Sequence, residues 1–199
     1  MESGDVVAVL HDIRTQLRGL LKTTELAGPE LKAAEVIRQR LAEQGVLSLP
    51  SMQISPQVEL YDLRHQLGAT IPQLPPQLRS LAQACFSLAD LLFWFQRSSP
   101  QHPDFMAGHI NAEIIGPRGL ERRDDITVGI SLMRPGLTYP DHHHLPEEIY
   151  LVLSHGLWRQ ADDFWWSPGI GGYVYNPSHI VHAMRSVDTP LLALWCLKH

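Results

Sequence analysis

The chain has 199 residues, of which 44% are hydrophobic and 19% are charged, a composition that is typical of one folded domain and argues against a disordered chain. Its net charge of -5 argues against nucleic acid as a partner. Because no apolar run reaches about 18 residues and the N-terminus lacks a positively charged segment, we expect no membrane span, no secretion signal and a cytoplasmic location.

The first half of the sequence is predicted to be helical. Apolar residues recur at spacings of three and four from Val6 to Leu21, which predicts an amphipathic helix. A second helix is expected to begin near Pro29, because proline is tolerated in a first turn, and to end near Gly45. The apolar spacing predicts a further helix over residues 78–96.

The segments between these helices carry few periodic signals. Residues 46–57 are predicted to be a loop rich in proline and serine, and a loop of this length is a candidate lid over a binding site. Residues 58–67 are predicted to form a short helix and residues 71–76 a linker. The prolines within residues 98–103 are expected to end the helical half.

From about residue 108 the pattern changes to short segments rich in Ile, Val, Tyr and Trp, separated by Gly and Pro. Strands are predicted at residues 109–115, 126–133, 148–153, 156–160, 172–175, 180–186 and 190–197. This number and spacing are typical of a sandwich or a small barrel. We therefore predict an α+β fold, in which residues 1–107 form a helical extension packed on a β-barrel of residues 108–199, as one structural unit.

The densest chemistry lies in residues 136–156. Three adjacent histidines occur there, and six of the eleven histidines of the chain lie between positions 142 and 182. Such a cluster usually reflects metal ligation, because a buried histidine without a partner is costly. The central histidine, His143, is expected to point away from any metal.

The spacing of these residues predicts how they converge. His142 and His144 lie two apart, so they point to one side of an extended chain. Glu148 and Tyr150 share one face of the strand that follows. His182, after a proline turn downstream, completes a candidate ligand set. Imidazole nitrogens and a carboxylate oxygen suit a divalent transition metal.

The first of two motifs in this half resembles the first motif of the cupin family, G-x5-H-x-H-x3-E. The matching residues are Gly136, His142, His144 and Glu148. The glycine that closes the family motif is displaced by one position, to Gly156. This resemblance implies a single cupin β-barrel of the jelly-roll kind.

The second motif resembles G-x5-P-x-G-x2-H-x3-N of the same family. The matching residues are Gly171, Pro177 and His182. Two positions depart from the motif, since His179 replaces the glycine and Ser186 replaces the asparagine. These departures affect the turn and the end of the strand, and they leave every ligand position filled.

Two tyrosines sharpen the resemblance to the cupin-type bacterial lyases of dimethylsulfoniopropionate, especially the Q type. The residues that carry it are Tyr139, His142, His144, Glu148, Tyr150 and His182. The resemblance implies a metal held by His144, Glu148, Tyr150 and His182. It also implies a tyrosine base at the position of Tyr139, a bacterial origin, and dimethyl sulfide and acrylate as products.

The residues themselves suit such an elimination. A base must remove the proton α to the substrate carboxylate, and a divalent cation bound to that carboxylate stabilises the developing charge. A phenol has an ordinary pKa of about 10, which a nearby dication brings closer to neutral. Tyr139 and Tyr150 remain alternative bases at this point. His142 stands at a ligand position of the cupin motif, whereas the resemblance to the lyases implies that it lines the substrate pocket. Trp195 is expected to face the sulfonium, with an attraction of roughly 0.5 to 2 kcal/mol.

We expect one divalent transition metal per chain, with zinc, iron, manganese and nickel as candidates. A small zwitterionic substrate is the expected ligand, and a homodimer is considered as the assembly. The alternatives are another cupin enzyme, such as an iron dioxygenase or a sugar-phosphate isomerase, and a cupin that binds a small molecule without catalysis. An isomerase is the weaker of these, because the barrel motifs offer only Arg159, Arg185 and Lys198 to a phosphate.

Overall fold

The structure, a computed structural model, describes residues 1–22, 25–49, 68 and 70–199. The helix predicted at residues 58–67 and most of the loop predicted at residues 46–57 lie outside this part of the chain, and so does the lid role considered for that loop. No helix within the described residues is long and apolar enough to cross a membrane.

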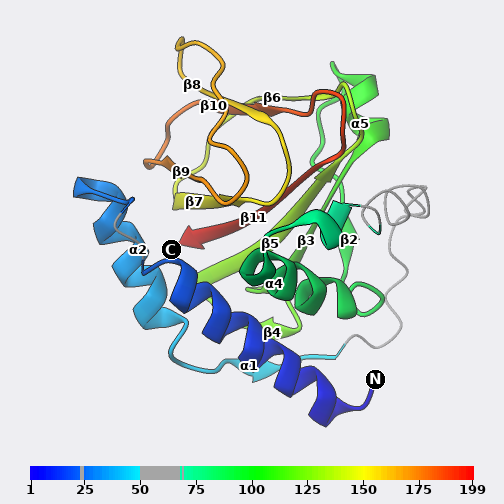
Figure 1. Ribbon diagram of the computed structural model, residues 1–199, viewed down its shortest axis with the longest axis vertical. Coiled ribbons are helices and arrows are strands. Elements are labelled where there is room, and N and C mark those ends of the chain that lie inside the picture. The colour runs from blue at the N-terminus through cyan, green and yellow to red at the C-terminus, as the bar shows by residue number, and fades with distance from the viewer. Residues whose placement is uncertain (23–24, 50–67, 69) are drawn as a thin grey trace.

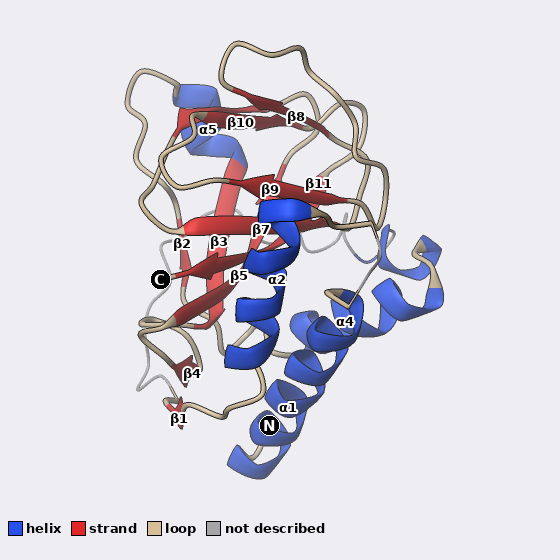
Figure 2. Cartoon of the chain, turned by 90° about the vertical axis from the view of Figure 1, so that its left-hand side faces the viewer, coloured by secondary structure: helices blue, strands red, loops and turns tan. Residues whose placement is uncertain are grey.

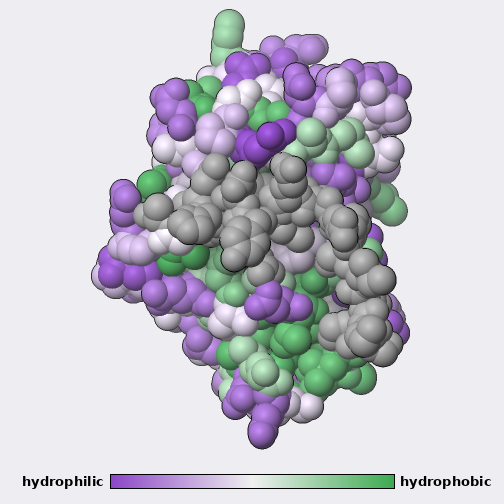
Figure 3. All heavy atoms as spheres, turned by 90° about the vertical axis from the view of Figure 1, so that its right-hand side faces the viewer, coloured by the Kyte–Doolittle hydropathy of each residue, from purple (hydrophilic) through white to green (hydrophobic). Residues whose placement is uncertain are grey.

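The described residues form three layers, which are helices, a large sheet and a small sheet (Figures 1 and 2). The helices are α1 (Ser3–Leu20), α2 (Gly28–Arg40), η1 (Ile71–Gln73), α4 (Pro76–Ser87) and α5 (Pro103–Gly108). Helices α1, α2 and α4 cover one face of the large sheet, and α5 lies at the opposite end, near the small sheet (Figure 2). Apolar side chains gather on the helical part of one face of the molecule (Figure 3).

The large sheet carries most of the strands of the described chain. In spatial order they are β1 (Val46–Leu47), β4 (Glu121–Arg122), β3 (His109–Ile115), β5 (Ile126–Met133), β11 (Leu191–Lys198), β7 (Glu147–Val152) and β9 (Tyr173–Asn176), with β2 (Trp94–Phe95) paired to β3. The small sheet has the order β6 (Thr138–His142), β10 (His182–Arg185) and β8 (Leu157–Gln160). All pairs are antiparallel except β3 with β4.

This arrangement confirms the predicted α+β fold. Two antiparallel sheets that face each other are the architecture of double-sheet jelly rolls, the class that includes the cupins. Within the described residues, the two sheets are not joined by hydrogen bonds into one closed ring, so the barrel is better described as two facing sheets.

The two faces of the large sheet have different tasks, and strand β11 shows this most clearly. Leu192, Leu194 and Cys196 belong to the hydrophobic cluster that also contains the buried stripes of the helices. Ala193 and Trp195 belong to a second cluster, which lies on the other face and includes side chains of the small sheet. Each fully buried large apolar side chain contributes about 1.5 to 3 kcal/mol, so the first face holds the helices in place.

The boundary between the helical extension and the β half at residue 108 remains a proposal. The two parts share one hydrophobic cluster, in which Ile13 and Leu81 of the helices are buried together with Ile130 and Leu194 of the sheet. This shared core supports the interpretation that both parts fold as one structural unit.

The predicted helix over residues 78–96 is wrong beyond Ser87, where α4 ends. Residues 94–95 instead form β2 and pair with β3. The indole N–H of Trp94 donates a hydrogen bond to the carbonyl of Ala89 at 2.9 Å, which closes the intervening turn. Leu88 and Leu92 are buried in the observed turn, so their spacing is helix-like without a helix. The apolar periodicity therefore predicted the burial of Leu88 and Leu92 correctly, but it predicted a helix where the chain forms a turn.

Several short elements have no counterpart in the prediction. Strands β1 and β4 have two residues each, which is too short to show an alternating pattern. Strand β6 contains Pro140 between polar residues, so it does not read as a strand. The predicted linker at residues 71–76 contains η1, and α5 begins at Pro103, the last residue of the predicted break at 98–103.

Candidate functional site

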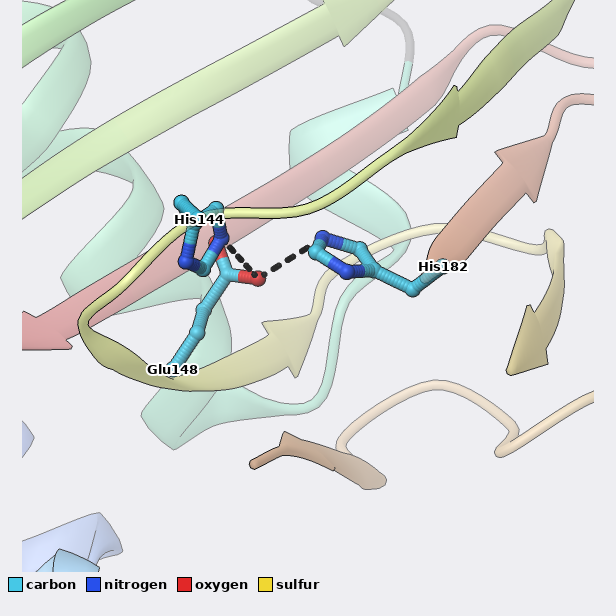
Figure 4. Close-up of side chains that lie close together, drawn as sticks. All are labelled: His144, Glu148 and His182. Carbon is cyan, nitrogen blue, oxygen red and sulfur yellow. Dashed lines mark ion pairs between the residues drawn. The ribbon is translucent and has the colours of Figure 1, made fainter. Parts of the chain in front are cut away.

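Three of the predicted ligands converge between the two sheets. His144 lies in the loop between β6 and β7, Glu148 on β7 and His182 at the start of β10. The Nε2 atoms of both histidines lie 3.3 Å from the same carboxylate oxygen of Glu148 (Figure 4). Possible ligand atoms of the three residues all lie within 4.8 Å of one another, so they form a group that could hold a metal ion.

The tautomers of these histidines are fixed by backbone carbonyls. His144 Nδ1 is 2.8 Å from the Pro146 carbonyl oxygen, and His182 Nδ1 is 3.0 Å from that of Ile180. A carbonyl oxygen only accepts, so each Nδ1 carries the proton and donates it. Each Nε2 then presents a lone pair toward Glu148. Lone pairs and a carboxylate oxygen repel one another unless a cation lies between them, and the donor set therefore fits a divalent metal.

Glu148 is 3% exposed, and its charge is held by the residues around it. Burial acts to raise the pKa of Glu148, but its interactions with His144 and His182 outweigh burial and lower the pKa. A second proton on either ring, at Nε2, stabilises the carboxylate as a metal ion in the same place would. Asn176 donates a further hydrogen bond to Glu148 Oε2 at 2.8 Å. Burial lowers the pKa of His144, and the neighbouring carboxylate raises it by more. The group is therefore built to hold a negative charge opposite a cation.

The two candidate tyrosines are both buried, but their surroundings differ. Burial raises the pKa of Tyr150, and the charge of Glu148 and a hydrogen bond with it raise the pKa further. Burial also raises the pKa of Tyr139, whereas the charge of Arg97 and hydrogen bonds from Arg97 and Asn111 act in the opposite direction. The charges of Glu148 and Arg97 act on both tyrosines, so the difference lies in the hydrogen bonds: the partner of Tyr150 opposes a phenolate, and the two partners of Tyr139 favour one.

His142 lies between the tyrosine and the ligand group. Its ring centroid is 4.6 Å from that of Tyr139 and 4.0 Å from that of His182. Burial is the main cause that lowers the pKa of His142 to about 3, so the ring is neutral near pH 7. Its Nδ1 donates to the carbonyl of Pro140 at 2.9 Å, as in the other two histidines of the site.

Two further residues singled out from the sequence, Trp195 and His143, lie outside the ligand group. The indole N–H of Trp195 is engaged with Ser131 Oγ at 3.0 Å, so part of this side chain serves the interior of the sheet. Its ring lies across Gly129, where an added Cβ would be 2.1 Å from a ring atom, and only glycine allows this approach. His143 is exposed and lies beside His179, with 5.9 Å between the ring centroids.

Four residues near the site were missed from the sequence, namely Arg97, His109, Asn111 and Asn176. A signal existed for two of them. His109 and Asn111 alternate with apolar residues along β3, so they lie on the face that points to the site. Arg97 lies in an irregular segment after β2, where no period indicates the direction of a side chain.

Both ring nitrogens of His109 face backbone groups. The backbone N–H of Arg97 donates to His109 Nε2 at 2.9 Å, and Nδ1 faces the carbonyl of Phe105. The ring stacks on Phe105 with 3.5 Å between centroids. Burial is the largest cause that lowers the pKa of His109, to about 4, and the charge of Arg97 lowers it further, against the opposing effect of the Phe105 carbonyl.

We expect the free energy of unfolding to fall as the pH falls from about 6.5 to about 4. The unfolded chain binds a proton at His109 near its ordinary pKa of 6.5, whereas the folded chain resists protonation down to about 4. In the His109→Gln variant, the loss of stability over this window should be smaller than in the wild type. Urea unfolding midpoints measured across the window test this, and equal slopes for the two proteins would contradict it.

Sequence comparison agrees with the resemblance stated for the motifs. The family model of dimethylsulfoniopropionate lyase matches residues 34–193, most of the chain. The curated protein Dimethylsulfoniopropionate lyase DddQ of Ruegeria pomeroyi is 34% identical over 94 residues. This match covers 46% of the chain and spans 46% of the length of that relative.

Solved structures share the fold over nearly the whole chain. A crystal structure from work on the DMSP lyases RdDddP and RnDddQII has a TM-score of 0.71 at 22% identity and covers 98% of this chain and 94% of its own. DMSP lyase DddQ from Ruegeria pomeroyi has a TM-score of 0.59 at 24% identity, with coverages of 93% and 92%. At these identities the structures establish the fold, and the family model establishes the relationship. The chain belongs to the dimethylsulfoniopropionate lyase family.

Proposed function

We propose that this protein is a metal-dependent lyase that cleaves dimethylsulfoniopropionate to dimethyl sulfide and acrylate. The observation that carries this proposal is the convergence of His144, Glu148 and His182 near the buried Tyr139, whose pKa is raised by burial while Arg97 and Asn111 act to lower it. The family to which the chain belongs supports the choice of substrate.

The proposed ligands are His144, Glu148 and His182, with Tyr150 as the fourth. Glu148 and Tyr150 lie two residues apart on β7 and so on the same face of the strand, and the two side chains interact directly. A single divalent ion held there would supply Lewis-acid polarisation of the substrate carboxylate. Zinc, iron, manganese and nickel all suit nitrogen and oxygen ligands, and we propose one such ion per chain.

Tyr139 is the proposed base. Its phenolate oxygen takes the proton α to the carboxylate, the electron pair of that C–H bond forms the double bond of acrylate, and the β-carbon to sulfur bond breaks. The electron pair of the broken bond leaves with sulfur, so a positive sulfonium departs as neutral dimethyl sulfide. No acid is needed for a neutral leaving group. The proton on Tyr139 then returns to solvent, which regenerates the base.

The remaining predicted residues have supporting roles in this proposal. His142 stays neutral and lies between Tyr139 and His182, where it can contact the substrate without competing for its proton. Trp195 belongs to the apolar cluster on the same face of the large sheet, which suits contact with the methyl groups of the sulfonium. We also propose that the protein acts in the bacterial cytoplasm on this small zwitterion, and a homodimer is the proposed assembly.

The proposal is tested by headspace gas chromatography. Purified protein loaded separately with zinc, iron, manganese or nickel is incubated with dimethylsulfoniopropionate. At least one of the metals is expected to give dimethyl sulfide and an equal amount of acrylate, and a chelator should abolish the release. Absence of release with every metal would reject the lyase function.

A further inference from the structure

A buried chain of polar side chains crosses three neighbouring strands of the large sheet. The indole N–H of Trp195 on β11 donates to Ser131 Oγ on β5 at 3.0 Å, and Ser131 Oγ donates to Asn111 Oδ1 on β3 at 2.6 Å. The three residues are 7%, 2% and 4% exposed, respectively. None of these three residues belongs to the proposed ligand set, so the order of donors and acceptors in this hydrogen-bonded series needs a separate explanation.

The donor-to-acceptor direction of the series follows from the chemistry of Trp195. An indole N–H can only donate, so Ser131 must accept from Trp195. Ser131 has a single proton, and it uses this proton toward the Asn111 carbonyl oxygen. With its oxygen engaged in this way, Asn111 presents its amide nitrogen, which carries two protons, to its other neighbour. Asn111 lies two residues beyond His109 on β3, and so on the same face as the ring that contacts Tyr139; its neighbour there is the hydroxyl of Tyr139.

The second neighbour of this hydroxyl is also a donor. The guanidinium of Arg97 interacts with Tyr139 through its side chain, and a guanidinium has no acceptor. The ring of Tyr139 is held by Phe105 and His109, with 4.5 Å and 5.5 Å between the ring centroids. The oxygen is therefore fixed in place and meets donors from two sides.

We propose that Asn111 and Arg97 are positioning residues that hold the Tyr139 oxygen as a hydrogen-bond acceptor, and that Trp195 and Ser131 keep the Asn111 amide turned for this purpose. This inference rests on the proposed function, in which Tyr139 takes the substrate proton. It gives Trp195 a second role, as the first donor of the series Trp195, Ser131 and Asn111, which we call the relay; Gly129 leaves the space that the Trp195 ring needs. It also distinguishes the tyrosines, because Tyr150 meets the carboxylate of Glu148 instead of donors.

The kinetic test compares substitutions that leave the ligand group untouched. Asn111→Asp keeps the shape of the side chain and replaces the donating nitrogen with an oxygen. We expect kcat to fall by at least about tenfold, a part of the range of about 10² to 10⁴ that a general base contributes, with KM and metal content unchanged. Ser131→Ala should lower kcat in the same direction by a smaller factor, because the amide loses its fixed orientation.

Ser154→Ala is the matched control for Ser131→Ala. Ser154 is 2% exposed, as Ser131 is, and its Oγ accepts a hydrogen bond from the backbone N–H of Leu192 at 2.6 Å. Its loss should reduce stability to a similar degree without reducing kcat. The proposal is overturned if Asn111→Asp retains wild-type kcat, or if both serine variants lower kcat equally.

A second measurement does not depend on turnover. In ¹H–¹⁵N spectra, Tyr139→Phe should shift the side-chain amide resonances of Asn111 and leave the indole resonance of Trp195 in place. Ser131→Ala should shift both. If the wild type releases no dimethyl sulfide but the spectra change as expected, the proposed function fails and the relay stands. If the enzyme is active and the Asn111 amide does not respond to Tyr139→Phe, the relay is rejected and the function stands.

Discussion

The His182→Ala variant is expected to lose its bound metal and, with it, the release of dimethyl sulfide. His182 is 3% exposed, its Nδ1 is held by a backbone carbonyl, and its Nε2 faces Glu148 at 3.3 Å. Loss of a residue that only supports a ligand commonly lowers metal affinity 10- to 100-fold, so loss of a ligand should lower it by more than about 100-fold. Elemental analysis of the purified protein and a metal titration measure this directly.

His143→Ala is the control for this variant, because it also removes one histidine from the same segment. His143 is exposed and points toward His179. Metal content and activity should remain at wild-type levels. Full metal retention in His182→Ala would show that the ligand set is wrong, and equal losses in both variants would show a nonspecific effect of removing histidine.

The Tyr139→Phe variant is expected to lose about 10² to 10⁴ in kcat while it retains its metal. The substitution removes only the oxygen that is proposed to take the substrate proton. The phenylalanine ring can keep the contacts with Phe105 and His142, so the fold should be preserved. Initial rates of dimethyl sulfide release and metal content, measured on the same preparation, separate catalysis from metal binding.

Two other tyrosines define what this result means. Tyr173→Phe also removes a hydroxyl, one that donates to the Leu20 carbonyl at 2.7 Å on the helical side of the sheet, and it should leave kcat unchanged. Tyr150→Phe removes a proposed ligand and should weaken metal binding. If Tyr139→Phe keeps most of its activity and Tyr150→Phe loses activity with full metal content, the base is Tyr150.

The site could be predicted largely because alternation on a strand is a geometric rule. Glu148 and Tyr150 were placed on one face of a strand and Ile149 on the other, and the structure separates them in this way. The spacing from the histidine cluster to His182 was also sufficient to predict that distant segments meet. The roles of these residues as ligands and base stay predictions that the variants above address.

The parts that could not be predicted depend on contacts that no local pattern encodes. Arg97 reaches Tyr139 from an irregular segment, whose path is fixed by the pairing of β2 with β3. The end of α4 could not be located, because Leu88 and Leu92 are buried in a turn as they would be in a helix. Asn111 was recognisable as a polar residue in an apolar strand, but its partner on β5 depends on strand register.

The alternation along β11 has a consequence for how this protein can change during evolution. Positions 192, 194 and 196 face the helices, and positions 193 and 195 face the site. Substitutions at the first set alter how firmly the molecule is held together, and those at the second set alter what it does. A single inserted residue would exchange the two sets at once. Point substitutions can therefore vary stability and chemistry independently in this strand, whereas changes in its length cannot.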